Sequence, residues 1–470
     1  MSGIVAMIWA ENGPAEATTL EKITARMAYR GPDRLRTWSD AHAGLGHALL
    51  KLGNQTESAE QPLTLDGQTW ISADARIDER DLLSTGLRRH GSQVTRDSPD
   101  AFLIAEAHRV FGTDCLQHLK GDFAFAIWDQ PAQRLIAAVD RFAIRPLYYA
   151  WAGKMFMVSS CLESLRFHPG FRADLDEAAV GDFLLFGHYR DPAATIFAGA
   201  RRLPPAHVLI LEAGGLTISR YWSPADSTLK LPGNGRALME EFKGVLDAAV
   251  ADRLQSGHTA ILLSGGLDSA VIAASACKRS QRGPSAELHA HTAVYKQLIP
   301  DDEQEFATQS AQALGLPISF FAADDFEIFD WIDRLGWMPP EPLDLPGLGA
   351  TVDFHRRIAA DSPVILTGHD GDSLFKASVP AHCRGLLRAG HFSTLVRDVA
   401  WYTYRQRRLP HLGWHRRWRK RPERTEPPML PAWLRPDWVR RSGLEERWQK
   451  AHEQSIETGP RDRALAALSS

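Results

Sequence analysis

The stretch from residue 260 to residue 270 constrains the fold more than any other part of the sequence. An apolar run, Ala260-Ile261-Leu262-Leu263, is followed by Ser264-Gly265-Gly266-Leu267-Asp268-Ser269 and then by residues that favour helix. This order predicts a strand, a tight turn and the start of a helix. Glycines let the backbone approach a ligand closely, and the first turn of a helix offers free N–H groups and the positive end of its dipole. The stretch therefore predicts a phosphate-binding loop.

A carboxylate in such a loop indicates a metal ion. Asp268 would repel a phosphate unless a hard cation such as Mg²⁺ bridges the two groups, while Ser264 and Ser269 add hydroxyls. No lysine follows the glycines, so the pattern differs from the Gly-x-x-x-x-Gly-Lys-Ser/Thr loop of kinases and GTPases. The residues predict a nucleotide bound with magnesium. The alternative is a turn that only joins a strand to a helix.

Composition excludes several classes of protein. The 470 residues, 44% hydrophobic and 24% charged, are typical of a globular chain of two or three domains. A net charge of −3 predicts no overall attraction to nucleic acid or to an anionic membrane. The four cysteines have no paired spacing, which argues against a zinc site and a disulfide framework. Because the chain also lacks a signal-peptide pattern and an 18-residue apolar stretch, we expect a cytoplasmic protein.

The pattern of secondary structure changes near residue 225. Before it, short alternating or β-branched runs predict a mostly β domain, and the polar, proline- and glycine-containing segment 222–235 predicts a linker. After it, strands alternate with helices, which favours a doubly wound parallel sheet that binds ligands at the carboxyl ends of its strands. We predict an α/β protein with domains 1–225 and 236–470. The expected strands are 3–9, 44–50, 69–73, 135–139, 154–159, 207–211, 259–263, 288–295 and 364–366, and the expected helices are 20–27, 101–110, 237–254, 270–279 and 302–314.

Four motifs before the linker resemble the glutaminase-like half of the asparagine synthetases. They are Tyr29-Arg30-Gly31-Pro32-Asp33, Glu60-Gln61-Pro62-Leu63, and the segments 119–129 and 140–149, in the family's order. The loop 264–269 resembles the pyrophosphate loop of the N-type ATP pyrophosphatases. The resemblance reaches about residue 375 and implies an Ntn-hydrolase-like α+β sandwich followed by an ATP pyrophosphatase domain. Such enzymes split ATP between its α and β phosphates and convert a substrate carboxylate into an acyl-adenylate.

The sequence departs from the glutamine-dependent members at their glutaminase site. Ser2 stands where those enzymes have an N-terminal cysteine nucleophile, and a hydroxyl is a far weaker nucleophile near neutral pH. Leu49 replaces the arginine of the His-x-Arg-Leu motif, and Ala73-Asp74-Ala75 replaces the Asn-Gly-Glu turn, whereas Asp100 is kept. We therefore predict a degenerate glutaminase domain that serves a structural or docking role.

The synthetase half keeps a second nucleotide-site motif. Residues 364–375 resemble the family's Ser-Gly-Glu-Gly-x-Asp-Glu-x-Phe segment. The resemblance implies that Asp372 is a metal ligand opposite Asp268 and that Thr367 and Gly368 lie against ATP. It also implies that Leu262, Leu263 and Val294 line the adenine pocket. As apolar strand residues, these three are equally suited to the core.

Two residues are candidates for a catalytic role. His369 replaces the glutamate that asparagine synthetases place near the reacting amine, and an imidazole is suited to take a proton from an attacking α-amine near neutral pH. A structural histidine is the alternative. Glu341 lies in the loop that faces substrate in the resembling family.

The segment 401–424 is basic and carries interleaved aromatic residues, a composition that nucleic-acid-binding segments share. No nucleic-acid-binding fold accompanies it, so we favour a solvated helical face, or else contact with a peptide or a partner protein. Relatives continue with an Arg-x-Pro-Phe-x-Asp segment and a phosphate-neutralising lysine, which this sequence lacks. We expect either a truncated sequence or an arginine of the basic segment in the lysine's place.

The pattern from Thr367 to Asp372, after a degenerate glutaminase half, most resembles the lasso-peptide macrolactam synthetases, which are related to β-lactam synthetases. The resemblance implies an ATP- and Mg²⁺-dependent, AMP-forming ligase that joins a carboxylate side chain of a precursor peptide to the peptide's own amine. A leader peptidase and a leader-binding protein are the partners it suggests. The alternatives are an asparagine synthetase that uses ammonia or glutamine and a non-catalytic scaffold that binds nucleotide or peptide.

Overall fold

The computed structural model describes residues 1–9, 14–52, 60–226, 235–254, 257–281, 286–327, 329, 331–334, 339–345, 347–371, 379–388, 390–409 and 429–457. Contacts divide the chain into two compact units. The first unit contains Met1–Ala179 and Gly187–Gly368, and the second contains Val180–Phe186 and His369–Ser470.

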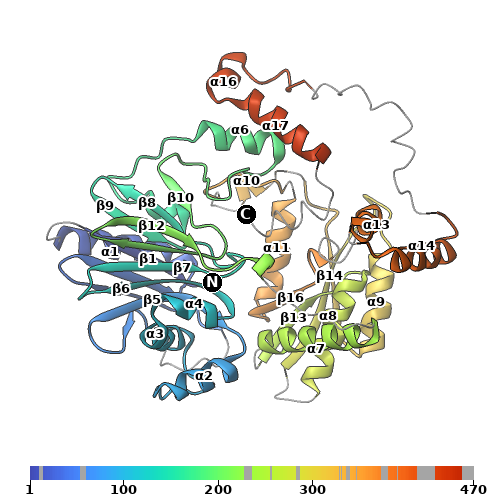
Figure 1. Ribbon diagram of the computed structural model, residues 1–470, viewed down its shortest axis with the longest axis horizontal. Helices are drawn as coiled ribbons and strands as arrows, with labels where there is room; N and C mark the ends of the chain where they lie inside the picture. The colour runs from blue at the N-terminus through green and yellow to red at the C-terminus, as the bar shows by residue number, and fades with distance from the viewer. Residues whose placement is uncertain are drawn as a thin grey trace. The chain divides into compact units, whose positions relative to one another are not determined.

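The N-terminal half of the chain forms two antiparallel sheets of six strands each (Figure 1). The order in the first sheet is β10 (Ala200–Arg202), β8 (Tyr148–Ala152), β9 (Met155–Ser159), β1 (Gly3–Ile8), β3 (Ala43–Leu49) and β2 (Arg34–Ser39). The order in the second is β12 (Gly215–Arg220), β11 (His207–Glu212), β7 (Arg134–Val139), β6 (Gly121–Asp129), β5 (Thr69–Ile77) and β4 (Leu63–Thr64). The helices of this half are α1 (Pro14–Arg26), α2 (Arg80–Arg89), α3 (Asp100–Phe111), α4 (Cys115–His118) and α5 (Leu162–Leu165), with short 3₁₀ helices η1 (Met27–Tyr29), η2 (Gly112–Asp114) and η3 (Pro224–Asp226).

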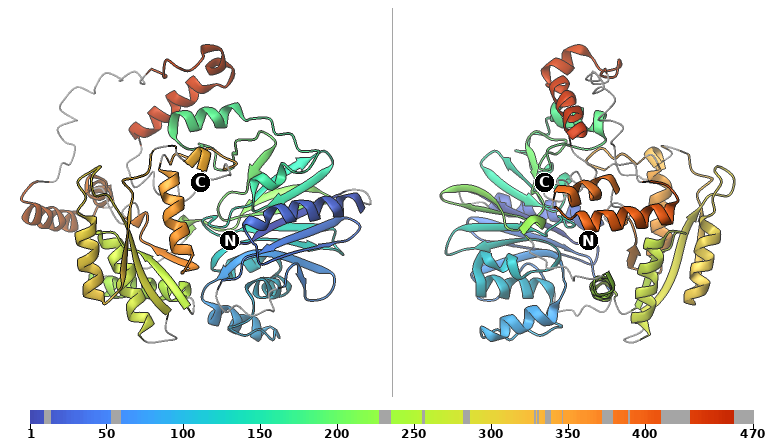
Figure 2. Two further views of the ribbon diagram at one scale, coloured as in Figure 1. Left: turned by 180° about the vertical axis from the view of Figure 1, so that it is seen from behind. Right: turned by 45° about the vertical axis from the view of Figure 1, so that its right-hand side comes forward.

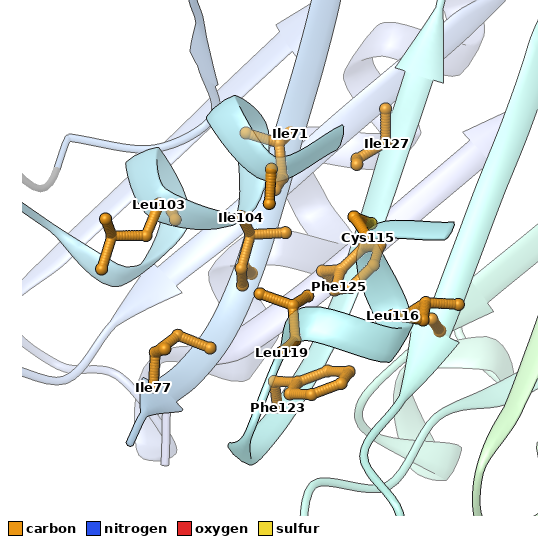
Figure 3. Packing of buried hydrophobic residues seen from close by; sticks show 14 of the residues in the cluster. Ile71, Ile77, Leu103, Ile104, Cys115, Leu116, Leu119, Phe123, Phe125 and Ile127 are labelled. Atoms are coloured by element: carbon orange, nitrogen blue, oxygen red, sulfur yellow. The ribbon is translucent and has the colours of Figure 1, made fainter. Parts of the chain in front are cut away.

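Three apolar clusters hold these layers together. One lies between the two sheets and contains inward-facing residues of both, such as Ile4 and Trp128. A second joins the first sheet to α1 and α5, and a third joins the second sheet to α2, α3 and α4. Figure 3 shows this third cluster, in which side chains of α3 and α4 pack against those of β5 and β6. The arrangement confirms the predicted sandwich, with helices on its outer faces.

Burial of His47 makes the stability of this sandwich depend on pH. His47 is 2% exposed on β3, and burial lowers its pKa to about 4. Below the ordinary pKa of histidine, His47 binds a proton in the unfolded chain but not in the folded chain. The free energy of unfolding therefore falls as the pH falls. From about pH 7 to about pH 5 we expect a loss of about 2 kcal/mol from this group. Urea unfolding of wild type and His47→Gln should differ in pH dependence by this amount. Equal pH dependence would contradict the assignment.

The C-terminal half contains a four-stranded parallel sheet in the order β15 (Ile318–Ala322), β14 (Ala286–Val294), β13 (Gly257–Leu262) and β16 (Val364–Thr367). Its helices are α7 (Gly235–Arg253), α8 (Leu267–Ser280), α9 (Glu303–Leu314), α10 (Trp331–Arg334) and α11 (Leu348–Ala359). One face of the sheet packs against apolar residues of α7, α8 and α9. On the other face Phe321 packs against Phe354 of α11, with ring centroids 5.1 Å apart, so helices cover both sides of the sheet, as predicted. Figure 2 shows the same helices from behind and from one side.

The order of the strands creates a switch point beside β13. The chain runs from β13 to β14 and β15 on one side and then crosses to β16 on the other. In open parallel sheets such a reversal opens a crevice at the carboxyl ends of the two neighbouring strands. The segments that follow β13 and β16 are the two nucleotide motifs predicted from the sequence.

The second unit combines part of α6 (Glu177–Phe186) with helices from the end of the chain. Arg447 Nε donates to Asp182 Oδ1 at 2.9 Å, and Phe186 stacks on Trp448 with ring centroids 5.5 Å apart. The other helices are α13 (Val379–Arg388), α14 (Phe392–Gln406), α16 (Pro436–Arg441) and α17 (Leu444–Glu457). No helix among the described residues has the length and apolarity that a membrane span needs.

Candidate functional site

Hydrogen bonds between two serines fix the loop from β13 to α8. Ser264 N donates to Ser269 Oγ at 3.1 Å, and the two hydroxyl oxygens lie 2.9 Å apart. Gly266 N donates to Ser264 Oγ at 3.3 Å. A Cβ on Gly265 would lie 2.6 Å from Cβ of Phe306 in α9, so only glycine fits there. The serines and glycines of the motif therefore shape the loop.

The start of α8 is open to solvent. Gly266 is the N-cap residue, and no described side chain makes a capping hydrogen bond to the first turn. Leu267 is 83% exposed, and Asp268 lies half-buried in the first turn. Free N–H groups at the positive end of a helix bind anions, and phosphates in particular. The geometry of the loop is suited to a phosphate group.

The second loop lies directly against the first. Leu262 pairs with Thr367, the last residue of β16. A Cβ on Gly368 would lie 2.7 Å from the backbone nitrogen of Ser269 and 2.9 Å from the carbonyl carbon of Asp268. The structure thus brings Thr367 and Gly368 beside the start of α8.

The three apolar residues assigned to an adenine pocket differ in exposure. Leu263 and Val294 are each 1% exposed, and Leu263 belongs to the core beneath α7, α8 and α9. Leu262 keeps a partly exposed surface. Of the three, Leu262 alone offers more than marginal surface to a ligand.

The remaining predicted site residues are Asp372, His369 and Glu341. Asp372, the predicted second metal ligand, lies outside the described residues. His369 is exposed and belongs to the second unit, immediately after Gly368 in the chain. Glu341 precedes α11 and forms an ion pair with Arg202 of β10, with Nη2 and Oε2 2.8 Å apart. No local sequence pattern indicates Arg202, because 139 positions separate it from Glu341.

A separate cavity of about 490 Å³ lies in the N-terminal half. Its lining includes the residues at the glutaminase motifs discussed above, namely Ser2, Leu49, residues 73–75 and Asp100. The lining also contains four arginines that are not among the predicted site residues, namely Arg76, Arg80, Arg96 and Arg145.

The acidic groups of this cavity are bound to the protein itself. Asp74 Oδ1 accepts a hydrogen bond from Ser2 N at 3.1 Å, and its other oxygen lies 3.5 Å from Arg145 Nη1. Asp100 accepts a hydrogen bond from Ile77 N at 3.0 Å and pairs with Arg80. Burial raises the pKa of Asp100, an effect that the Arg80 charge opposes. Both carboxyl groups are thus paired with groups of the protein and are not available to bind the amine of an incoming amino acid.

Two family models match the chain. Residues 1–222 match the glutamine amidotransferase domain, and residues 241–467 match asparagine synthase. The chain belongs to the asparagine synthase family. Its amidotransferase half is the antiparallel sandwich, and its synthase half contains the parallel sheet.

Curated relatives of this family are identical to the chain at about a quarter of the aligned positions. It is 29% identical over 382 residues to the glutamine-hydrolysing asparagine synthetase 3 of Bacillus subtilis, covering 77% of this chain and 60% of the relative. It is 26% identical over 388 residues to amidase chry2 of Gibberella zeae, covering 77% and 56%. The chain thus spans three fifths or less of the length of these relatives. Glutamine phosphoribosylpyrophosphate amidotransferase of B. subtilis, a solved structure, aligns over 72% of this chain and 68% of its own at 14% identity, with a TM-score of only 0.33.

Members of the asparagine synthase family generally use ATP and Mg²⁺. The open start of α8 and the hydroxyls of Ser264 and Ser269 fit the phosphates of a nucleotide, and the Asp268 side chain fits a hard cation. Bound there, Mg²⁺ would neutralise charge on the phosphates of ATP. Together with Gly368, these groups would hold the nucleotide.

Replacing Ser2 with cysteine should not create a glutaminase. The thiol would restore the nucleophile, but Leu49 cannot pair with a carboxylate, and Asp74 and Asp100 remain bound to Ser2 N, Arg145 and Arg80. We expect glutamine hydrolysis by Ser2→Cys to stay at the wild-type background, measured as glutamate release. Ser2→Ala should leave ATP-dependent pyrophosphate release unchanged. Appreciable glutamate release by the cysteine variant would contradict the conclusion that the acidic groups of this cavity cannot bind glutamine.

Proposed function

We propose that the chain is an ATP- and Mg²⁺-dependent, AMP-forming amide ligase that adenylates a carboxylate side chain and joins it to an amine. The observation that carries this proposal is the contrast between the two halves. The loop after β13, with Gly368 against it, offers hydroxyls and backbone N–H groups that suit phosphates, whereas the cavity around Ser2 has its acidic groups bound internally. The amine therefore comes from outside the amidotransferase half.

We further propose that the carboxylate and the amine belong to one precursor peptide, which is closed into a lasso macrolactam. A peptide that brings its own N-terminal amine needs no ammonia supply, which is consistent with Ser2 in place of cysteine. In this proposal His369 accepts the proton that the amine loses as it attacks the acyl-adenylate. Asp268 and Asp372 would hold the metal, and a leader peptidase and a leader-binding protein would act on the same peptide.

A second candidate is asparagine synthesis from aspartate. Similarity to the B. subtilis relative favours it, since that protein is named as a glutamine-hydrolysing asparagine synthetase. With the cavity around Ser2 arranged as described, free ammonia would be the nitrogen source.

Pyrophosphate release separates these functions. The full-length protein is incubated with ATP and Mg²⁺ and with one of three additions: aspartate and ammonium, aspartate and glutamine, or a ring-length peptide with an internal Asp or Glu. Release that requires the peptide, with a product lighter by one water, supports macrolactam formation. Release with aspartate and ammonium supports asparagine synthesis instead. Release with none of them would leave a nucleotide- or peptide-binding scaffold as the better description.

A further inference from the structure

The cavity around Ser2 contains one guanidinium whose hydrogen-bonding capacity is largely unused. Arg145 lines this cavity of about 490 Å³, and its side chain is 13% exposed. The carboxylate paired with it is that of Asp74, with Nη1 and Oδ2 3.5 Å apart, which is longer than a normal hydrogen bond. Nε is buried without a hydrogen-bond partner among the described residues, whereas the terminal nitrogens remain accessible from the cavity. Because an arginine carries five N–H donors, the terminal ones can serve a second anion.

The other arginines of the lining are bound to protein acceptors. Arg76 and Arg80 each pair with a buried or half-buried carboxylate. Arg96 is 62% exposed, and its Nη1 lies 3.3 Å from Asp81 Oδ2. Arg145 is therefore the cation of this lining that is best placed to bind an anion from solution.

The carboxylates of the lining leave room for such an anion. Asp74 also accepts a hydrogen bond from Ser2 N at 3.1 Å, so its charge is shared between two donors. Asp252, near the end of α7, accepts a hydrogen bond from Glu79 N at 3.4 Å, and Asp97 is exposed to solvent. Among the described residues, Asp74 is the carboxylate that forms an ion pair with Arg145.

The lining on the β3 side of this cavity is apolar. Leu49, Leu50 and Leu52 all line the cavity and are partly exposed. Two alanines flank Asp74 in β5, at positions 73 and 75, and they belong to the same lining. Apolar side chains of a cavity are stabilised when the apolar surface of a ligand covers them. The cavity therefore combines one free cationic group with an apolar wall.

We propose that the cavity around Ser2 binds a monocarboxylate with an apolar body, whose carboxylate pairs with Arg145 and whose body packs against Leu49, Leu50 and Leu52. Such a ligand has no ammonium group, which agrees with a cavity whose Asp74 and Asp100 are paired within the protein. A volume of about 490 Å³ is sufficient for a small organic acid. The amidotransferase half thus has a ligand of its own, whichever reaction the other half catalyses.

Binding of a simple branched acid tests the proposal. The probe is 4-methylpentanoate, and the control ligand is 4-methylpentanamide, which has nearly the same shape but no charge. Calorimetric titration of the full-length protein at pH 7 should show that the amide binds about 10-fold or more weakly than the acid, because a charge-assisted pair with Arg145 is lost. Glutamine should not bind, since its ammonium group finds no free carboxylate and its amide meets the leucines.

Three variants locate the binding site. Arg145→Met should weaken binding of 4-methylpentanoate by about 10-fold or more. Arg96→Met is the matched control, because it removes the same charge from the same lining but from a side chain that pairs with Asp81. Its affinity should stay within about 2-fold of wild type. Leu49→Asn should weaken binding by about 5-fold, because it replaces an apolar contact with a polar group.

Thermal unfolding of each variant shows whether it is folded. Equal binding of acid and amide, no binding of the acid by wild type, or preferential binding of glutamine would each overturn the proposal. Unchanged affinity in folded Arg145→Met, or an equal loss in Arg96→Met, would do the same. If Arg145→Met does not fold, the comparison of acid with amide and the Leu49→Asn variant decide. None of these measurements uses pyrophosphate release, so their failure is distinct from failure of the ligase proposal.

Discussion

Asp268→Ala should lower ATP-dependent pyrophosphate release by about 1,000-fold, because a metal that loses a protein ligand no longer neutralises the phosphates at the start of α8. The side chain lies in the first turn of that helix, where it makes no contribution to the apolar core. The substitution should therefore leave thermal unfolding nearly unchanged. Pyrophosphate release and the Mg²⁺-dependent stabilisation of the protein by ATP are the two measurements.

Glu287→Ala is the matched control for this substitution. Glu287 is an exposed acidic residue near the amino end of β14, the opposite edge of the same sheet. Removing it changes the net charge equally but should leave pyrophosphate release intact. Wild-type release by Asp268→Ala would refute the metal assignment, and an equal loss in both variants would show that the effect is one of overall charge.

Gly368→Ala should lower pyrophosphate release by about 100-fold. The new Cβ would lie 2.7 Å from Ser269 N and 2.9 Å from the Asp268 carbonyl carbon, and backbone atoms cannot yield as a flexible side chain can. Relieving such overlap typically costs about 1–3 kcal/mol, and here it would push the two loops of the nucleotide site apart. The measurement is pyrophosphate release over a range of ATP concentrations.

Gly347→Ala provides the control for the added methyl group. Gly347 is the N-cap residue of α11, and a Cβ there meets no described atom within 4 Å. This variant should behave as wild type. Full activity in Gly368→Ala would mean that the close approach of the two loops is not needed for nucleotide binding.

Local sequence pattern was enough to predict most of the sheet that carries the nucleotide loops. The expected strand at 259–263 is observed as Gly257–Leu262, and the expected helix at 270–279 as Leu267–Ser280. These elements were predictable because their apolar residues recur with the period of the element. The strand Ile318–Ala322 was missed, since a five-residue run with two exposed aromatic or polar positions has too little pattern to stand out.

The candidate site was predictable only where it is local in sequence. The serines and glycines of residues 264–269 shape one loop, and a motif can show them together. The approach of Gly368 to this loop depends on the pairing of β13 with β16, which joins residues about 100 positions apart. The Arg202–Glu341 pair depends on contacts between the two halves of the chain. The periodicity of apolar residues is local in sequence and cannot predict such contacts.

The helix α6 has a consequence for any attempt to dissect the protein. Asp182 is 1% exposed and is paired with Arg447 of α17, and a Cβ on Gly181 would already lie 2.3 Å from Leu444. An amidotransferase fragment cut at the linker would keep α6 but lose α17, so Asp182 would lose its counter-ion and Leu185 would lose the apolar residues that cover it. The linker is therefore a poor place to divide this polypeptide, although the sequence changes character there.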